Sequence, residues 1–287
     1  MSNSYRGGAP LRGRELIAMS ADDIQSLIQA IVRWIHVVAA ILWVGQTYLF
    51  IFFEHNIVRR HEDAEDVSGS LWMMHGSGYY FLEKQGFSVS RPGTLHWFEW
   101  EAIITWLTGA ILMGMIYYKE SILIDMDEMV YATGAICGLS VIFGGFLLYS
   151  IILRTPIARS GTVMAAVGLI GVAAAHYGLL HVQSARSAFF HIGAAMGTIM
   201  AFNVVMGVIP AQNKNLKALA EGRDPDPKVN ALTPMRAKHN SYMAIPLVFV
   251  MISNQYPTVS YGHQYSTCIL TGVVAAGFAA AHWLRRR

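Results

Sequence analysis

The histidines of this sequence stand out because six of the eleven lie in or at the edges of long apolar segments. His36 lies within the first such segment, His176 and His181 close a middle one, His191 opens another, and His263 and His282 bracket the last. Burying a neutral imidazole costs free energy unless a partner compensates for the lost water. A haem iron is one such partner, and a hydrogen bond to a neighbouring helix is the other.

Three of these histidines are candidates for haem binding in the outer half of the membrane. His36 and His191 are each followed, one helical turn on, by small side chains that would leave clearance for a flat macrocycle: Ala39 and Ala40, and Ala194 and Ala195. His176 is the third candidate, at a similar depth. Imidazoles from two helices can hold a b-type haem as axial ligands. The sequence predicts haem b with iron ligated by His36 and His191, although hydrogen bonding explains any single histidine equally well.

A second group of histidines gathers near the inner face and is a candidate substrate or second haem site. His75 is followed by two glycines that would let backbone N–H groups approach an anion such as a haem propionate, or would simply form a tight turn. His96 precedes Glu99 and Glu101, an acid–base neighbourhood, although carboxylates also favour helix starts. With His239, these residues give the candidate catalytic set His96, Glu101 and His239, and His75 joins the candidate cofactor ligands.

Composition identifies an integral membrane protein. Of 287 residues, 54% are hydrophobic and only 14% are charged, which is untypical of soluble enzymes. The formal net charge of +3 gives no indication of nucleic acid binding. Cys137 and Cys268 show no C-x-x-C or C-x-x-C-H spacing, which excludes a thiolate metal site and covalent c-type haem. The first 26 residues lack an apolar signal-peptide core, so we expect the first membrane segment to direct insertion.

A bilayer-crossing helix needs about 20 apolar residues, and this criterion predicts an all-α bundle of about seven, possibly eight, transmembrane helices. The predicted spans are 27–53, 101–118, 129–153, 161–181, 187–209, 241–256 and 261–284, within a membrane domain of 27–284 between a polar segment 1–26 and a basic tail 285–287. We expect an interfacial segment at about 60–100, with helix and turn over 67–100, because a solvated loop rarely holds so many aromatic residues.

The distribution of basic residues predicts the orientation. With the N-terminus outside, the inner segments hold 15 of the 21 lysines and arginines, as the positive-inside rule favours. The expected location is a bacterial inner (cytoplasmic) membrane, with the C-terminus inside.

Several stretches carry a resemblance to a known family. They are RWIHVVAAILWVG (33–45), HGSGYY (75–80), LHWFEWEAIITWLTG (95–109), AFFHIGAAMGTIMAFNVVMGVIPAQNK (188–214), EGRDPDP (221–227) and KHNSYMAIPLVFVMISNQYP (238–257). In this order they resemble the N-terminal membrane domain of the bacterial urate hydroxylases, or membrane urate oxidases. The resemblance implies oxidation of urate to 5-hydroxyisourate with cytochrome c as electron acceptor. The matched motifs carry over His36, His75, His96, His191 and His239.

The chain departs from that family at three points. The family usually has a fused cytochrome c domain, and without a C-x-x-C-H motif we expect a separate cytochrome c here. Where the family pattern has a lysine before Trp-Glu-Ala this chain has Glu99, and where it has a histidine before Tyr-Pro it has Gln255. A carboxylate in place of a cation would weaken binding of the urate anion by about 1 kcal/mol or more.

Two functions follow from these observations. The first is a membrane-embedded redox protein with one or two b haems, passing electrons from urate or a related small reductant to a separate cytochrome c. The alternative is a non-catalytic subunit, haem-carrying or structural, of a larger respiratory or electron-transfer membrane complex.

Overall fold

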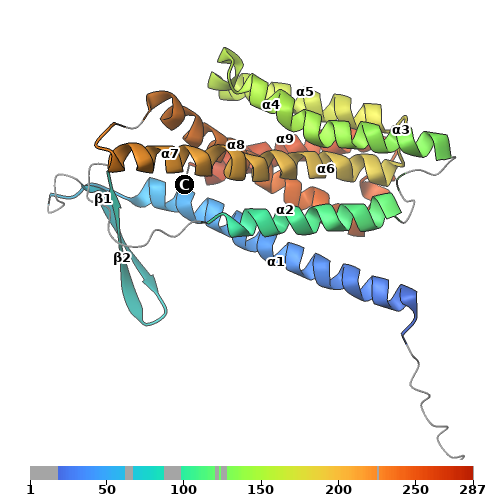
Figure 1. Cartoon of the computed structure of the whole chain (residues 1–287), viewed down its shortest axis with the longest axis horizontal. Helices are drawn as coiled ribbons and strands as arrows, with labels where there is room; N and C mark the ends of the chain where they lie inside the picture. Colours follow the sequence, from blue (N-terminus) through green and yellow to red (C-terminus); the bar gives the residue numbers. More distant parts are fainter. Residues whose placement is uncertain are drawn as a thin grey trace, which may run out of the picture.

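The computed structural model describes residues 19–61, 67–86, 98–119, 123, 128–224 and 226–286. These residues form a bundle of helices with one β-hairpin beside it (Figure 1). The elements are α1 (Ala21–Asn56), β1 (Val67–His75), β2 (Gly78–Gln85), α2 (Trp100–Met113), η1 (Gly114–Lys119), α3 (Glu128–Leu139), η2 (Ser140–Gly144), α4 (Gly145–Ile152), η3 (Pro156–Arg159), α5 (Gly161–Leu179), α6 (Ala185–Phe202), η4 (Asn203–Val208), α7 (Ile209–Ala220), α8 (Pro227–Ile252), η5 (Ser253–Gln255), η6 (Pro257–Val259) and α9 (Ser266–Leu284). The predicted all-α membrane fold is confirmed.

Six helical segments of the described chain are long and apolar enough to cross a bilayer. They are Ala21–Asn56, Trp100–Lys119, Tyr131–Ile152, Gly161–Leu179, Ala185–Ala220 and Ser266–Leu284. The first begins with a capping box, in which the Ser20 hydroxyl accepts from the backbone N–H of Asp23 and the Asp23 carboxylate accepts from that of Ser20. Its 36 residues extend about 54 Å, so α1 reaches well past the hydrocarbon core of about 30 Å.

The predicted span 241–256 differs from the structure. Its residues up to Ile252 form the apolar half of α8, whose first half is polar and whose last turns contain Pro246. The helix packs between α6 and α9, and the ring of Pro246 fits against Gly277, where a Cβ would stand only 2.7 Å away. Small residues allow such close helix approach in membranes. The number of crossings, and with it the orientation of the termini, stays a prediction.

The interfacial helix expected over 67–100 is wrong where the structure describes it. Strands β1 and β2 pair antiparallel instead, with Trp72 opposite Phe81 and their rings 4.7 Å apart. Such cross-strand aromatic pairs stabilise a hairpin. The two-residue turn places Gly76 at φ 63°, a left-handed conformation that glycine adopts without strain. The hairpin projects from the end of α1 (Figure 1). Because apolar side chains lie on both faces of its strands, the sequence lacks the alternation of apolar and polar residues that predicts a strand.

Helix α6 is the centre of the bundle, and it packs against α2, α4, α5 and α8 (Figure 1). Its buried face includes His191, which is fully buried. Gly138 of α3 faces this part of α6: a Cβ there would stand 2.6 Å from the His191 ring and 2.5 Å from Nε2 of Gln183. Because no side chain fits between these helices, Gly138 sets their distance.

We expect Gly138→Ala to destabilise the fold by about 1–3 kcal/mol, because the added methyl overpacks a closed interface. The matched control is Gly171→Ala in α5, where a Cβ meets nothing within 4 Å; it should be neutral or slightly stabilising. Thermal unfolding in detergent, followed by circular dichroism, measures both. Equal melting temperatures for the two variants would contradict this account of the interface.

Candidate functional site

His36 lies on α1 at its contact with α2, and its ring is partly buried. Nδ1 lies 2.9 Å from the backbone oxygen of Thr105 and 3.1 Å from Oγ1 of Thr108. A carbonyl oxygen can only accept a hydrogen bond, so Nδ1 carries the proton and Nε2 keeps its lone pair. Metal-ligating histidines are commonly held in this way, with the other ring nitrogen bonded to a backbone carbonyl.

His191 is held differently, because both of its ring nitrogens contact protein. Nδ1 lies 2.8 Å from the backbone oxygen of Ser187, and Nε2 lies 2.9 Å from the hydroxyl of Tyr118. The first contact fixes the proton on Nδ1, so Tyr118 donates to Nε2. Gly138 closes the remaining space beside Nε2. The geometry is that of a hydrogen-bonded structural histidine.

His36 and His191 share no hydrogen-bond partner among the described residues. His36 bonds to Thr105 and Thr108 of α2 through Nδ1 alone, whereas Ser187 and Tyr118 take up both ring nitrogens of His191 and leave neither free for iron. Two axial ligands of one iron have to face each other across the metal. The described residues therefore do not fit a haem held between these two imidazoles, whereas His36 alone fits as a single ligand.

His176, the third predicted ligand, is fully buried between α5 and α9. Its Nδ1 lies 2.8 Å from Oγ1 of Thr267, and its ring meets Phe189 edge-on at 5.7 Å. Nε2 is buried and has no hydrogen-bond partner in the described part of the chain. An unsatisfied buried nitrogen costs about 1–3 kcal/mol, so this atom is a second position at which a ligand would be stabilising.

His239 belongs to a buried polar network near the end of α4, η4 and α8. Nδ1 of His239 lies 3.0 Å from the Tyr149 hydroxyl, which accepts from Nδ2 of Asn203 at 2.9 Å. Asn203 also donates to Oδ1 of Asn240 at 2.9 Å, and Nη1 of Arg236 donates to Oδ1 of Asn203 at 2.6 Å. These bonds join α4, η4 and α8.

Arg236 brings a positive charge into this network without a matching negative charge. Among the described residues, no carboxylate lies within ion-pair distance of its guanidinium, since the ion pairs found there join other residues. Arg154 is near enough to repel it electrostatically. Gly207 leaves the room that the side chain occupies, because a Cβ would stand 2.8 Å from Cδ of Arg236. Such a site favours an anion.

Sequence reasoning missed Arg236, Tyr149 and Tyr118. A signal existed for the first: Arg236, His239 and Asn240 stand at i, i+3 and i+4, which places them on one face of a helix. The two tyrosines carried no such signal. Tyr118 lies in the π-helical segment η1, and Asn203 opens the π-helical segment η4. Such segments shift the register of a helix and are frequent at functional sites.

The other predicted site residues lie apart from these imidazoles. His75 is exposed at the tip of the hairpin, so the tight-turn explanation of its glycines is confirmed. His96 lies outside the described residues. Oε1 of Glu101 accepts a hydrogen bond of 2.9 Å from Nε2 of Gln46 on α1. His181, His263 and His282 are exposed. No group of three or more histidine, cysteine or acidic side chains among the described residues could hold a metal ion.

Comparison with known proteins gives one match. No curated protein and no solved structure matches the chain. The model of the family described as "Urate oxidase N-terminal" matches residues 22–287. This range takes in the whole helical bundle and the hairpin, including His36, His191 and the Arg236 network. The chain therefore belongs to the urate oxidase N-terminal family.

Proposed function

We propose that this chain is a membrane-embedded redox protein that oxidises urate and passes the electrons to a separate cytochrome c. Family membership supports a urate hydroxylase-like function. Conversion of urate and water into 5-hydroxyisourate releases two electrons and two protons, so the reaction needs an electron acceptor. The proposed location is a bacterial inner membrane, with the N-terminus outside and the C-terminus inside.

The observation that carries the proposal is the charge of the Arg236 network. Urate is a monoanion near neutral pH, with ring N–H groups and carbonyl oxygens around a flat bicycle. Arg236 offers a cationic fork. Asn203 holds it in place, because its Oδ1 accepts from Nη1 of Arg236 while its Nδ2 donates to Asn240. Tyr149 and both asparagines are at most 7% exposed, so their contacts are shielded from water and are correspondingly strong.

His239 fits the catalytic role that the sequence predicts for it. Tyr149 accepts from Asn203 and can donate its own proton to Nδ1 of His239. In that arrangement the imidazole proton is on Nε2, for which no hydrogen bond is found among the described residues. An N–H at this position would donate a hydrogen bond to an anionic substrate, and the Tyr149 hydroxyl would hold the imidazole in that tautomer.

We infer that the predicted haem b is held by His36. Its Nε2 carries a lone pair, and its Nδ1–H is fixed by Thr105. A haem bound there would supply one-electron transfer between substrate and acceptor. His176 is the further position for a ligand, and His191 stabilises the bundle through Tyr118 instead.

Alanine substitution separates these roles. We expect His36→Ala to abolish the b-type band in a reduced-minus-oxidised spectrum of the purified protein. His191→Ala should keep the full band per folded molecule while lowering thermal stability by about 1–3 kcal/mol, because it leaves the Tyr118 hydroxyl unpaired. Full retention of the band in His36→Ala would rule out this ligand, and its loss in His191→Ala alone would restore that residue as the ligand.

Removal of the guanidinium tests the substrate site. We expect Arg236→Gln to raise the KM for urate at least about tenfold in urate-dependent reduction of cytochrome c, because a charge-assisted hydrogen bond contributes about 1.5–3 kcal/mol. Arg159→Gln is the matched control, since Arg159 is exposed in the neighbouring η3 segment. An unchanged KM in Arg236→Gln would show that the Arg236 network does not bind the substrate.

A non-catalytic subunit is the second candidate, favoured by the carboxylate of Glu99 where the family has a lysine. It predicts a b-type band that urate never reduces in the wild-type protein, with any cytochrome c. That outcome would rule out the enzyme proposal and favour an electron-transfer subunit of a larger membrane complex.

A further inference from the structure

We propose that the groove between α1 and α2 binds a benzoquinol with an apolar tail, and that it binds the reduced quinol more tightly than the oxidised quinone. The proposal rests on the shape of this groove and on the polar atoms at its end. It does not depend on urate being the substrate.

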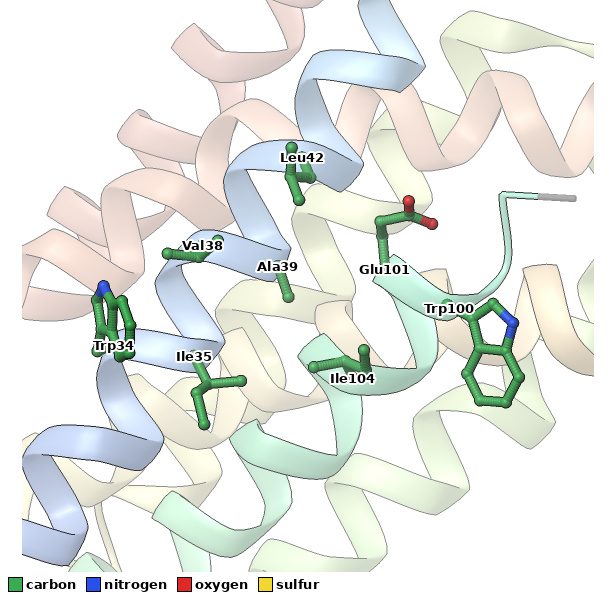
Figure 2. Close-up of a pocket in the computed structure, with 8 residues that line it drawn as sticks. All are labelled: Trp34, Ile35, Val38, Ala39, Leu42, Trp100, Glu101 and Ile104. Carbon is green, nitrogen blue, oxygen red and sulfur yellow. The ribbon is translucent and has the colours of Figure 1, made fainter.

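The groove has a volume of about 280 Å³ and opens on the outside of the helix pair (Figure 2). Its lining residues are Trp34, Ile35, Val38, Ala39 and Leu42 of α1, and Trp100, Glu101 and Ile104 of α2. Except for Ala39 and Glu101, these side chains are between 38% and 68% exposed in the isolated chain. In a spanning helix pair, apolar side chains with this exposure face lipid, so the groove is entered from the bilayer.

A single carboxylate stands in this apolar wall. Figure 2 shows Glu101 at one end of the groove, beside Leu42 and Trp100. One of its oxygens accepts from Gln46, but its other oxygen, Oε2, is buried and has no hydrogen-bond partner among the residues that the structure describes. Within the same described ranges, Oε1 of Gln46 is buried and unpartnered as well. Buried polar atoms without partners are rare and costly, which indicates that a ligand supplies what is missing.

What is missing is a hydrogen-bond donor. Both unpartnered atoms are oxygens, which accept hydrogen bonds, and Gln46 already donates one hydrogen bond to Glu101. A quinol presents two hydroxyl donors, whereas a quinone presents only carbonyl acceptors. The negative end of a quinone carbonyl facing Glu101 would be repelled by the negative carboxylate. We therefore expect the groove to distinguish the two oxidation states by their capacity to donate hydrogen bonds.

The size and position of the groove favour one substituted ring with a tail. Ligand pockets typically measure about 300–1,000 Å³, so 280 Å³ suits a single ring and not a porphyrin. Trp34 and Trp100 lie toward opposite ends of the groove (Figure 2). Indole faces stack well on a flat ring. The carboxylate also repels urate, so this groove and the Arg236 network select different molecules.

Equilibrium binding measures the proposed preference. Radiolabelled decylubiquinol and decylubiquinone are titrated onto the purified full chain in nanodiscs, with empty nanodiscs subtracted for partition into lipid. We expect the wild type to bind the quinol at least about tenfold more tightly, the factor that corresponds to 1.4 kcal/mol and that one hydrogen bond to a charged group supplies. Glu101→Gln should lose most of this preference, because an amide can also donate to a quinone carbonyl.

Filling the groove tests the location. Val38→Trp places an indole in it and should weaken quinol binding at least about tenfold, whereas Ile41→Trp adds the same ring to the lipid face of α1, outside the groove, and should bind like the wild type. Equal affinity of the wild type for quinol and quinone would overturn the proposal. So would unweakened binding in Val38→Trp, which would indicate that the groove takes only lipid chains.

Discussion

Polar side chains inside this bundle have to find their partners on other helices, because the hydrocarbon core of a bilayer offers none. The histidines show this constraint most clearly: His36 joins α1 to α2, His191 joins α6 to η1, and His176 joins α5 to α9. Each bond fixes two helices in register. The same bonds decide which ring nitrogen keeps a lone pair, so packing of the bundle and chemistry of the site are set by one set of contacts.

The histidines predicted to bind haem differ in their hydrogen-bond partners as well as in their burial. His36 faces a backbone oxygen with one nitrogen only, whereas a serine carbonyl and the Tyr118 hydroxyl occupy both nitrogens of His191. The small residues Ala194 and Ala195 are expected to leave clearance for a macrocycle near His191. In the structure, Gly138 of α3 lies against the His191 ring and closes the space beside it.

The sequence sufficed for the helical membrane fold, since the length and apolarity of a segment are local properties. It failed for the hairpin, where apolar residues on both faces hide the strand period, and for Arg236 and Tyr149, whose meaning depends on which helices meet. The pairing of His36 and His191 on one haem stays a prediction: depth can be counted along one helix, but the rotation of a helix about its axis is set by packing.

Two sites of opposite character follow from this arrangement. The Arg236 network, where α4, η4 and α8 meet, holds a cation that forms no ion pair with a carboxylate of the described residues, and a cation attracts an anion. The groove at Glu101 holds a carboxylate with an unpartnered oxygen and opens toward lipid. Glu99, which stands where the resemblance to the urate hydroxylases implies a lysine, lies one residue before Trp100 of this groove and makes no hydrogen bond to the Arg236 network among the described residues. We therefore expect the charge at position 99 to act on the ligand proposed for the groove more than on an anion proposed at Arg236.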